Sequence, residues 1–318
     1  MGRLILLCLI VLLALQSCYI DMPHNSKMDP LNPFGEGQLV FHVYNKRGGG
    51  IENALISIGS DTLLTDSSGF AGPYEAIKGS LSIMVSKGHY TAVCIDTVIE
   101  TGDSMYVNRT LNFKPSIMDY QVTTSIVKTM SLTDSMDRFI TVNALIMEDD
   151  GSEDIARSDA SLSLTDMHVD CVSDSAGMLH YSGSIEEDTL SFNIFDLTGS
   201  IASLYIEDSD GEWDSLSDRT VSRFVQNIIE IVRPETGTDF NPPDTVKWLL
   251  DEPDYSTCIS LIIEDRDCEV VFRCDSLSSS KRQFAIDSLF TSGRYLLKMR
   301  LYDIYGNYSQ NSTIFTVK

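Results

Sequence analysis

The chain has 318 residues, and its 46 Asp and Glu against 23 Lys and Arg give a formal net charge of −23 at pH 7. Nucleic acids and anionic lipid surfaces bind clustered cations, so this charge argues against both as partners. Hydrophobic residues make up 43% of the chain, which is enough for globular cores, and the length predicts two or three domains.

The N-terminus predicts export from the cytoplasm. Arg3 is followed by an uninterrupted apolar run over residues 4–15. This run has the length of a secretory signal and is shorter than the roughly 20 residues that a membrane-spanning helix needs. We therefore expect residues 1–17 to be a signal peptide.

The end of the apolar run carries a lipidation signal. Leu15, Ser17 and Cys18 stand in the pattern of a lipobox, so this segment resembles that of bacterial lipoproteins. The resemblance implies a lipid on Cys18 and a protein anchored in the bacterial cell envelope. Tyr19 differs from the aspartate that retains lipoproteins at an inner membrane, which favours the outer membrane, at its periplasmic or its surface face. The alternative is an ordinary secretory signal with a chance cysteine.

Residues 18–35 are expected to form the lipidated cysteine and a flexible tether. They include three prolines, at positions 23, 30 and 33, and few aliphatic side chains. Such a composition cannot bury a core, but it suits a segment that links a lipid to a folded domain.

From residue 36 onward the pattern is that of β-strands. Short runs of alternating apolar residues, such as 54–58 and 81–85, are separated by turns rich in Gly, Asp and Ser. This spacing is typical of a β-sandwich. We therefore predict an all-β fold, in which tandem Ig-like or transthyretin-like β-sandwiches follow the signal peptide and the flexible tether.

A divergent internal repeat predicts a second sandwich after the first. The alternating run at 54–58 has a counterpart at 160–164, and the turn at 65–70 has one at 173–178. Repeats of this kind are read as repeated structural units. The domains predicted from them are 36–114 and 115–226.

Four short motifs distinguish the first predicted sandwich. They are Gly50, Asn53-Ala54, Thr65-Asp66-x-x-Gly69-Phe70 and Lys87-Gly88-His89-Tyr90. With them, residues 36–114 resemble the carboxypeptidase regulatory-like domain, a seven-stranded transthyretin-like sandwich. The resemblance implies that the strand at Ala54 pairs with the strand ending in Thr65. Many members of that family are non-catalytic appendages, so the resemblance implies a fold rather than an activity.

The turn within these motifs has a physical explanation in its side chains. Gly69 permits a backbone conformation that a side chain resists. The Asp66 carboxylate can accept hydrogen bonds from the amides of the turn. We expect both roles in the folded protein.

Residues 227–318 follow a different pattern. Trp248 lies in a strand just after Pro242-Pro243, and Tyr295 begins a strand that alternates cleanly. This combination resembles a fibronectin type III-like domain, in which the tryptophan belongs to the core and the tyrosine hydroxyl caps a backbone turn. We expect both residues in the core rather than in contact with a ligand.

Side chains that commonly carry chemistry form no recognisable constellation. The five histidines lack metal-ligand spacing, and no GxSxG elbow, Walker loop or dinucleotide fingerprint occurs. We therefore predict no enzyme, no catalytic residue and no cofactor apart from the lipid on Cys18. The remaining cysteines of the exported chain are odd in number, which leaves their disulfide pattern open. They are Cys94, Cys171, Cys258, Cys268 and Cys274.

Two acidic loops, at 148–154 and 207–214, are the candidate metal sites. Carboxylate oxygens within a few residues of one another suit calcium. The candidate ligands are Asp149, Asp150, Asp208 and Asp210. We expect solvated loops without a metal, and a calcium site that stabilises a sandwich rim is the alternative.

Trp213 lies between acidic residues in the second loop. We expect its ring to be buried at the rim of a sandwich. The alternative is an exposed ring that stacks on a sugar or on a protein partner, which makes Trp213 the candidate binding residue.

These features predict a non-enzymatic, membrane-anchored envelope lipoprotein that acts as a β-sandwich spacer or interaction scaffold for another envelope protein. A carbohydrate-binding surface lipoprotein, with a polysaccharide as its partner, is the first alternative. The second is an accessory to a glycan hydrolase, or a glycan hydrolase of low activity that uses the acidic loops.

Overall fold

The computed structural model of the chain describes the residues 27, 29, 32, 35–130, 135–162, 165–168, 170–173, 178–287 and 290–318, with the backbone alone over 165–173 and at 178. The predicted signal peptide, Cys18 and most of the tether lie outside these residues. The chain divides into two compact units, Met1–Phe113 (unit 1) and Lys114–Lys318 (unit 2).

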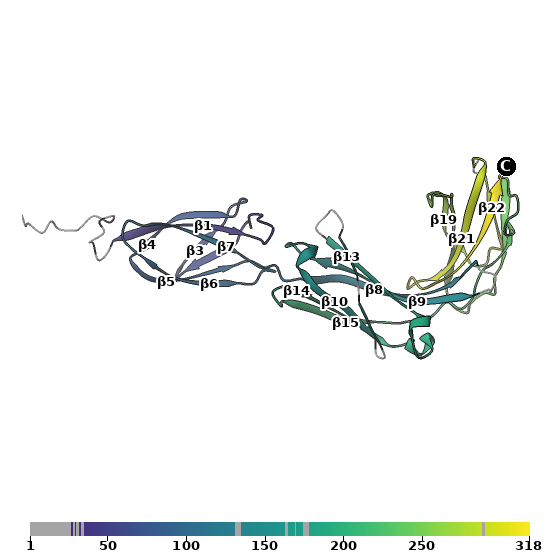
Figure 1. Cartoon of the computed structure of the whole chain (residues 1–318), viewed down its shortest axis with the longest axis horizontal. Coiled ribbons are helices and arrows are strands. Elements are labelled where there is room, and N and C mark those ends of the chain that lie inside the picture. The colour runs from purple at the N-terminus through teal and green to yellow at the C-terminus, as the bar shows by residue number, and fades with distance from the viewer. Residues whose placement is uncertain are drawn as a thin grey trace, which may run out of the picture. The chain divides into compact units, whose positions relative to one another are not determined.

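Unit 1 is a sandwich of two sheets (Figure 1). The first sheet has the order β4-β1-β7 and consists of β4 (Phe70–Ile77), β1 (Glu36–Tyr44) and β7 (Ser104–Thr110). The second has the order β3-β2-β5-β6 and consists of β3 (Asp61–Leu64), β2 (Leu55–Ile58), β5 (Gly79–Ser86) and β6 (Val93–Ile99). Alternating side chains such as Leu39, Phe41 and Ile56 are fully buried between the sheets.

The turn before β4 has the predicted chemistry. The Asp66 carboxylate accepts hydrogen bonds from Ser68 N at 2.8 Å and Phe70 N at 3.0 Å. Gly69 has φ of 81°, and a Cβ there would lie 2.1 Å from the Val43 carbonyl oxygen. The expected pairing is also present, since Leu55 of β2 lies opposite Leu64 of β3. Both expected roles, of Gly69 and of Asp66, are confirmed.

The described residues of unit 2 form three sheets. The largest has the order β12-β13-β9-β8-β22-β21-β18-β19 and consists of β12 (Asp170–Ser173), β13 (Met178–Glu186), β9 (Met136–Met147), β8 (Ser116–Lys128), β22 (Tyr308–Val317), β21 (Gly293–Asp303), β18 (Thr257–Glu264) and β19 (Val270–Ser278). The second has the order β11-β10-β14-β15 and consists of β11 (Thr165–His168), β10 (Ile155–Leu162), β14 (Ile201–Asp208) and β15 (Trp213–Thr220). The third has the order β16-β17-β20 and consists of β16 (Glu230–Arg233), β17 (Asp244–Leu249) and β20 (Gln283–Ile286).

Two hydrophobic cores lie within unit 2. One gathers residues between Ile117 and Phe224, and the other gathers residues between Val225 and Val317. The largest sheet runs through both, because β22 pairs in parallel with the end of β8, with Ser309 opposite Ile126. Residue 226, the predicted domain boundary, therefore lies where the two cores meet, while the sheet continues from one core to the other.

The expected core residues of the second core are confirmed. The Trp248 side chain is 1% exposed. The Tyr295 hydroxyl donates a hydrogen bond to the Thr291 carbonyl oxygen at 2.8 Å, as expected for a tyrosine that caps a backbone turn. Among the described residues, no helix is long and apolar enough to cross a bilayer.

Candidate functional site

The two acidic loops meet at one end of the first core of unit 2. Glu148 follows β9 and continues its inward-facing alternation after Ile146. Asp208 ends β14 and likewise continues an inward-facing alternation. β9 and β14 belong to different sheets, so the pleat of each sheet turns one carboxylate toward the interior.

The geometry of this acidic cluster is compact. Carboxylate oxygens of Glu148, Asp150 and Asp154 lie within 4.8 Å of one another. The second loop joins them, because Ser209 N donates to the Asp154 carbonyl oxygen at 2.8 Å and the Ser209 hydroxyl donates to the Asp154 carboxylate. Asp208 shapes its own turn by accepting hydrogen bonds from the amides of residues 210 and 212.

The cluster perturbs the titration of its central acid. The pKa of Glu148 is raised to about 8, mainly by burial, and the carboxylates of Asp150, Asp154 and Asp208 contribute to this rise. A hydrogen bond from Asp150 N to Glu148 Oε1, at 2.9 Å, acts in the opposite direction. The other carboxylate oxygen, Glu148 Oε2, is buried and has no hydrogen-bond partner in the described part of the chain.

The structure divides the four predicted candidate ligands into two pairs. Asp150 and Asp208 are buried in the cluster, each at 2% exposure, whereas Asp149 and Asp210 are exposed. The expectation of solvated loops is therefore wrong for Asp150 and Asp208. Asp208 is the last residue of β14, and Asp150 lies in the loop that follows β9. The sequence analysis did not propose Glu148 or Asp154 as ligands. Glu148 could have been found, because it continues the alternation of buried residues that runs to Ile146.

The second acidic loop also contacts the beginning of unit 2. Ile117 N donates a hydrogen bond to Asp214 Oδ2 at 2.8 Å. Lys114 forms an ion pair with Glu212 at 3.5 Å. The loop thus connects the acidic cluster to the first strand of its unit.

Trp213 is exposed, so the expectation of a buried rim residue is wrong. Its side chain is 61% exposed because β15 lies at the edge of its sheet and the ring faces outward. The ring stacks on Tyr205 with centroids 6.0 Å apart and planes 25° apart. The Arg157 guanidinium lies over the other ring, 5.3 Å from the Tyr205 centroid. We call Arg157, Tyr205 and Trp213 the aromatic row.

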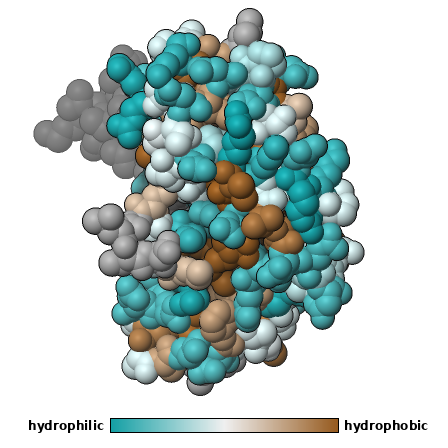
Figure 2. Space-filling model, turned by 90° about the vertical axis from the view of Figure 1, so that its right-hand side faces the viewer, coloured by the Kyte–Doolittle hydropathy of each residue, from teal (hydrophilic) through white to brown (hydrophobic). Residues whose placement is uncertain are grey.

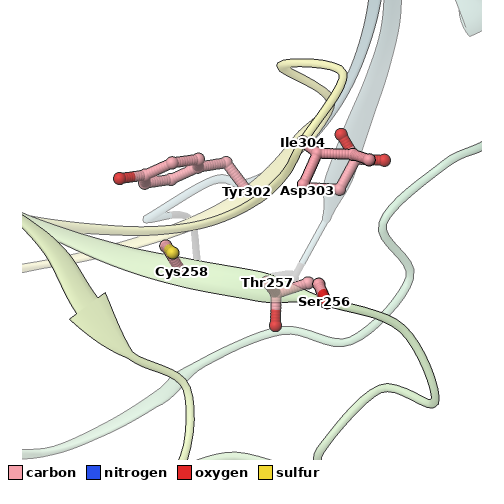
Figure 3. Close-up of a pocket in the computed structure, with 6 residues that line it drawn as sticks. All are labelled: Ser256, Thr257, Cys258, Tyr302, Asp303 and Ile304. Carbon is pink, nitrogen blue, oxygen red and sulfur yellow. The ribbon is translucent and has the colours of Figure 1, made fainter.

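A small pocket of about 120 Å³ lies in the second core region (Figure 3). It is lined by Ser256, Thr257, Cys258, Tyr302, Asp303 and Ile304. The Asp303 carboxylate already serves the turn between β21 and β22, since its Oδ1 accepts from Tyr305 N at 2.8 Å and Asn307 N at 3.1 Å. This pocket therefore belongs to the packing of that turn.

The described cysteine side chains are free thiols. They are Cys94, Cys258, Cys268 and Cys274. Cys171 lies on β12, of which the structure describes the backbone alone.

No family model and no curated protein matches the sequence. Among solved structures, the major pilin subunit BcpA of Bacillus cereus is similar at 8% identity and a TM-score of 0.33, over 89% of this chain and 96% of that one. Fibronectin(III)-like modules of Clostridium thermocellum CbhA are similar at 12% identity and a TM-score of 0.26, over 64% of this chain and 94% of theirs.

A third similar structure is Bacteroides ovatus SGBP-B, solved in complex with a mixed-linkage heptasaccharide. It has 12% identity and a TM-score of 0.20, over 87% of this chain and 65% of that one. The all-β fold of the present chain follows from its own sheets, which form tandem β-sandwiches in units 1 and 2.

Proposed function

We propose that the chain is a non-enzymatic bacterial envelope lipoprotein, held at the outer membrane through Cys18, that acts as a spacer and an interaction scaffold for another envelope protein. In this proposal residues 36–114 form a carboxypeptidase regulatory-like domain. Residues 227–318 form a fibronectin type III-like domain. The Asp66–Gly69 turn supports the first assignment, and the Tyr295 hydroxyl contact supports the second.

One observation carries the spacer function, namely the sheet that runs through both cores of unit 2. A spacer needs neighbouring modules that keep their relative position. The parallel pairing of β8 with β22 supplies backbone hydrogen bonds between the modules. Asn307, with 0% exposure, adds side-chain bonds at the same place, from Thr124 N at 2.9 Å and to Ser222 Oγ at 2.7 Å.

The edge strand β19 is the surface at which we place the protein partner. It ends the eight-stranded sheet, and Val270 and Val271 at its start are 53% and 41% exposed. An unpaired strand edge offers backbone donors and acceptors to an extended segment of another protein. Figure 2 shows that one face of the molecule is mostly hydrophilic and carries a hydrophobic patch.

Co-purification of the tagged, acylated chain from gently solubilised membranes tests the scaffold. We expect a stoichiometric protein partner in mass spectrometry, and its loss in the variant Val271→Lys, because a lysine on an edge discourages strand addition. Leu249→Lys is the matched control: Leu249 is 57% exposed but lies on β17, between β16 and β20. Recovery of the chain alone would contradict the scaffold function.

Carbohydrate binding is the second candidate function, and the aromatic row favours it. Exposed rings present flat apolar faces that stack on sugars, and neighbouring charged groups can bond their hydroxyls. A pull-down on insoluble and soluble polysaccharides tests it, with Trp213→Ala expected to abolish retention. Tyr106→Ala is the control, since Tyr106 is 70% exposed on β7 of unit 1. If Trp213→Ala and Tyr106→Ala are retained equally, the aromatic row is not a sugar-binding site.

A further inference from the structure

The acidic cluster of unit 2 buries four carboxylates, and one oxygen of Glu148 has no hydrogen-bond partner among the described residues. Glu148, Asp150, Asp154 and Asp208 are between 1% and 6% exposed. Buried polar atoms in folded proteins are nearly always bonded, so the unpaired Glu148 Oε2 needs an explanation. The charged groups that influence Glu148 most are all carboxylates, which raises the cost of burying it.

We infer that Glu148, Asp150 and Asp154 form a calcium-binding site at the rim of the first core of unit 2, with Asp208 adding negative charge beside it. The oxygens of the three acids lie within 4.8 Å of one another, so one ion can contact all three. The unpaired Glu148 Oε2 is the ligand position that the protein itself leaves unsatisfied.

The choice of calcium follows from the ligands and their burial. Among the described residues the cluster offers carboxylate oxygens and neither imidazole nor thiolate, which selects a hard cation rather than zinc or copper. Magnesium keeps several waters in a near-ideal octahedron, and three ligand residues with at most 6% exposure leave little room for them. Calcium accepts flexible geometry and carboxylates in one- or two-oxygen contacts.

A cation here would join the two sheets that enclose the first core. Glu148 follows β9 of the eight-stranded sheet, and Asp154 directly precedes β10 of the four-stranded sheet. Ser209 links the loop after β14 to Asp154. Calcium would therefore hold three chain segments at a sandwich end that is otherwise closed by hydrogen bonds between loops.

The test uses the full chain after removal of divalent ions with a chelator. We expect 1 mM Ca²⁺ to raise the melting temperature by about 5 °C or more, because an ion that binds the native state and not the unfolded state stabilises the fold. Calorimetric titration should give one ion per chain. Glu148→Gln keeps the shape but removes the charge, so we expect at least a tenfold weaker affinity and a higher metal-free melting temperature. Asp150→Asn provides a second, independent variant with the same loss of affinity.

Asp149→Asn and Asp210→Asn are matched controls, because these exposed acids lie in the same two loops. They should bind calcium as the unmodified chain does. A melting temperature that does not respond to Ca²⁺ would overturn the site. An equal response in Glu148→Gln and Asp149→Asn would assign binding to surface acids, and an equal response to Mg²⁺ would overturn the choice of calcium.

Discussion

At the scale of single residues, Asp275 shows how a neutral and a charged hydrogen-bond donor together lower the pKa of a carboxyl group. Ser260 donates a hydrogen bond to Asp275 Oδ1, and Arg273 Nε donates to Oδ2 at 2.6 Å. The pKa of Asp275 is lowered from its usual value. The hydrogen bond from Ser260 is the largest cause, and the hydrogen bond from Arg273 is the second. A lowered acid pKa stabilises the fold above the unfolded-state value, and that stability is lost as pH falls through the folded-state value.

We predict that Ser260→Ala raises the pKa of Asp275 toward the ordinary aspartate value. The stability lost between neutral and acid pH should shrink accordingly. Carboxyl titration by NMR measures the first effect, and urea unfolding at several pH values measures the second. Ser278→Ala is the control, because the Ser278 hydroxyl pairs with Ser280 and not with the carboxylate. An unchanged titration in Ser260→Ala would show that Arg273 and Arg300 lower this pKa without help from Ser260.

The acidic cluster illustrates what residue patterns can predict. The loops were recognisable from their composition, and Asp150 and Asp208 were among the candidate ligands. The burial of Asp208 was within reach of sequence reasoning, since Asp208 ends the alternation of buried residues in β14. That the two loops meet could not be predicted from local sequence, because it depends on the antiparallel pairing of β10 with β14, which places Ile155 opposite Asp208. Glu148 was within reach, since it continues the alternation of buried residues in β9, whereas Asp154 gave no such signal.

At the scale of elements, the turn before β4 depends on Gly69. Its φ of 81° disfavours any side chain, and an added Cβ would also lie 2.1 Å from the Val43 carbonyl oxygen. We predict that Gly69→Ala destabilises unit 1 by about 2 kcal/mol or more. Gly59→Ala separates the two causes, because Gly59 has φ of 59° but open space around it. Urea unfolding should show the smaller loss in Gly59→Ala, and equal losses would contradict a steric contribution.

The junction between the cores of unit 2 depends on Asn307. Its side chain accepts from Thr124 N and donates to Ser222 Oγ and, at 3.0 Å, to Asp303 Oδ2. Truncation would leave buried polar groups of three segments without this partner. We predict that Asn307→Ala costs about 3 kcal/mol and lets the two cores unfold at separate temperatures.

Differential scanning calorimetry of the full chain measures this separation. The control is Asn108→Ala, since Asn108 is exposed on β7 of unit 1. If Asn307→Ala broadens no transition and costs no more than the control, the Asn307 side chain does not couple the cores.

At the scale of the whole molecule, the all-β class followed from alternation and turns alone. The break between Phe113 and Lys114 lies beside the predicted boundary at 114. The continuity of one sheet through both cores of unit 2 had no sequence signal, because it depends on a parallel pairing between residues about 180 positions apart, as for Ser125 and Tyr308. Pairings at that distance are decided by packing, not by local propensity.

Membrane attachment is the last property that we propose for the whole chain, and the net charge of the chain makes it testable. With a formal net charge of −23, the chain gains nothing from anionic lipid, so the proposed attachment depends on acyl chains. Each buried methylene contributes about 0.8 kcal/mol, and two or more chains anchor stably. We predict that Cys18→Ala abolishes incorporation of labelled palmitate and moves the protein from the membrane to the soluble fraction. Cys8 lies within the apolar run, so the Cys8→Ala variant is the control. It should still incorporate the labelled palmitate and remain in the membrane fraction. Two outcomes would contradict the lipid anchor. One is a chain with Cys18 intact that incorporates no palmitate, and the other is a Cys18→Ala variant that stays in the membrane fraction after a high-salt wash.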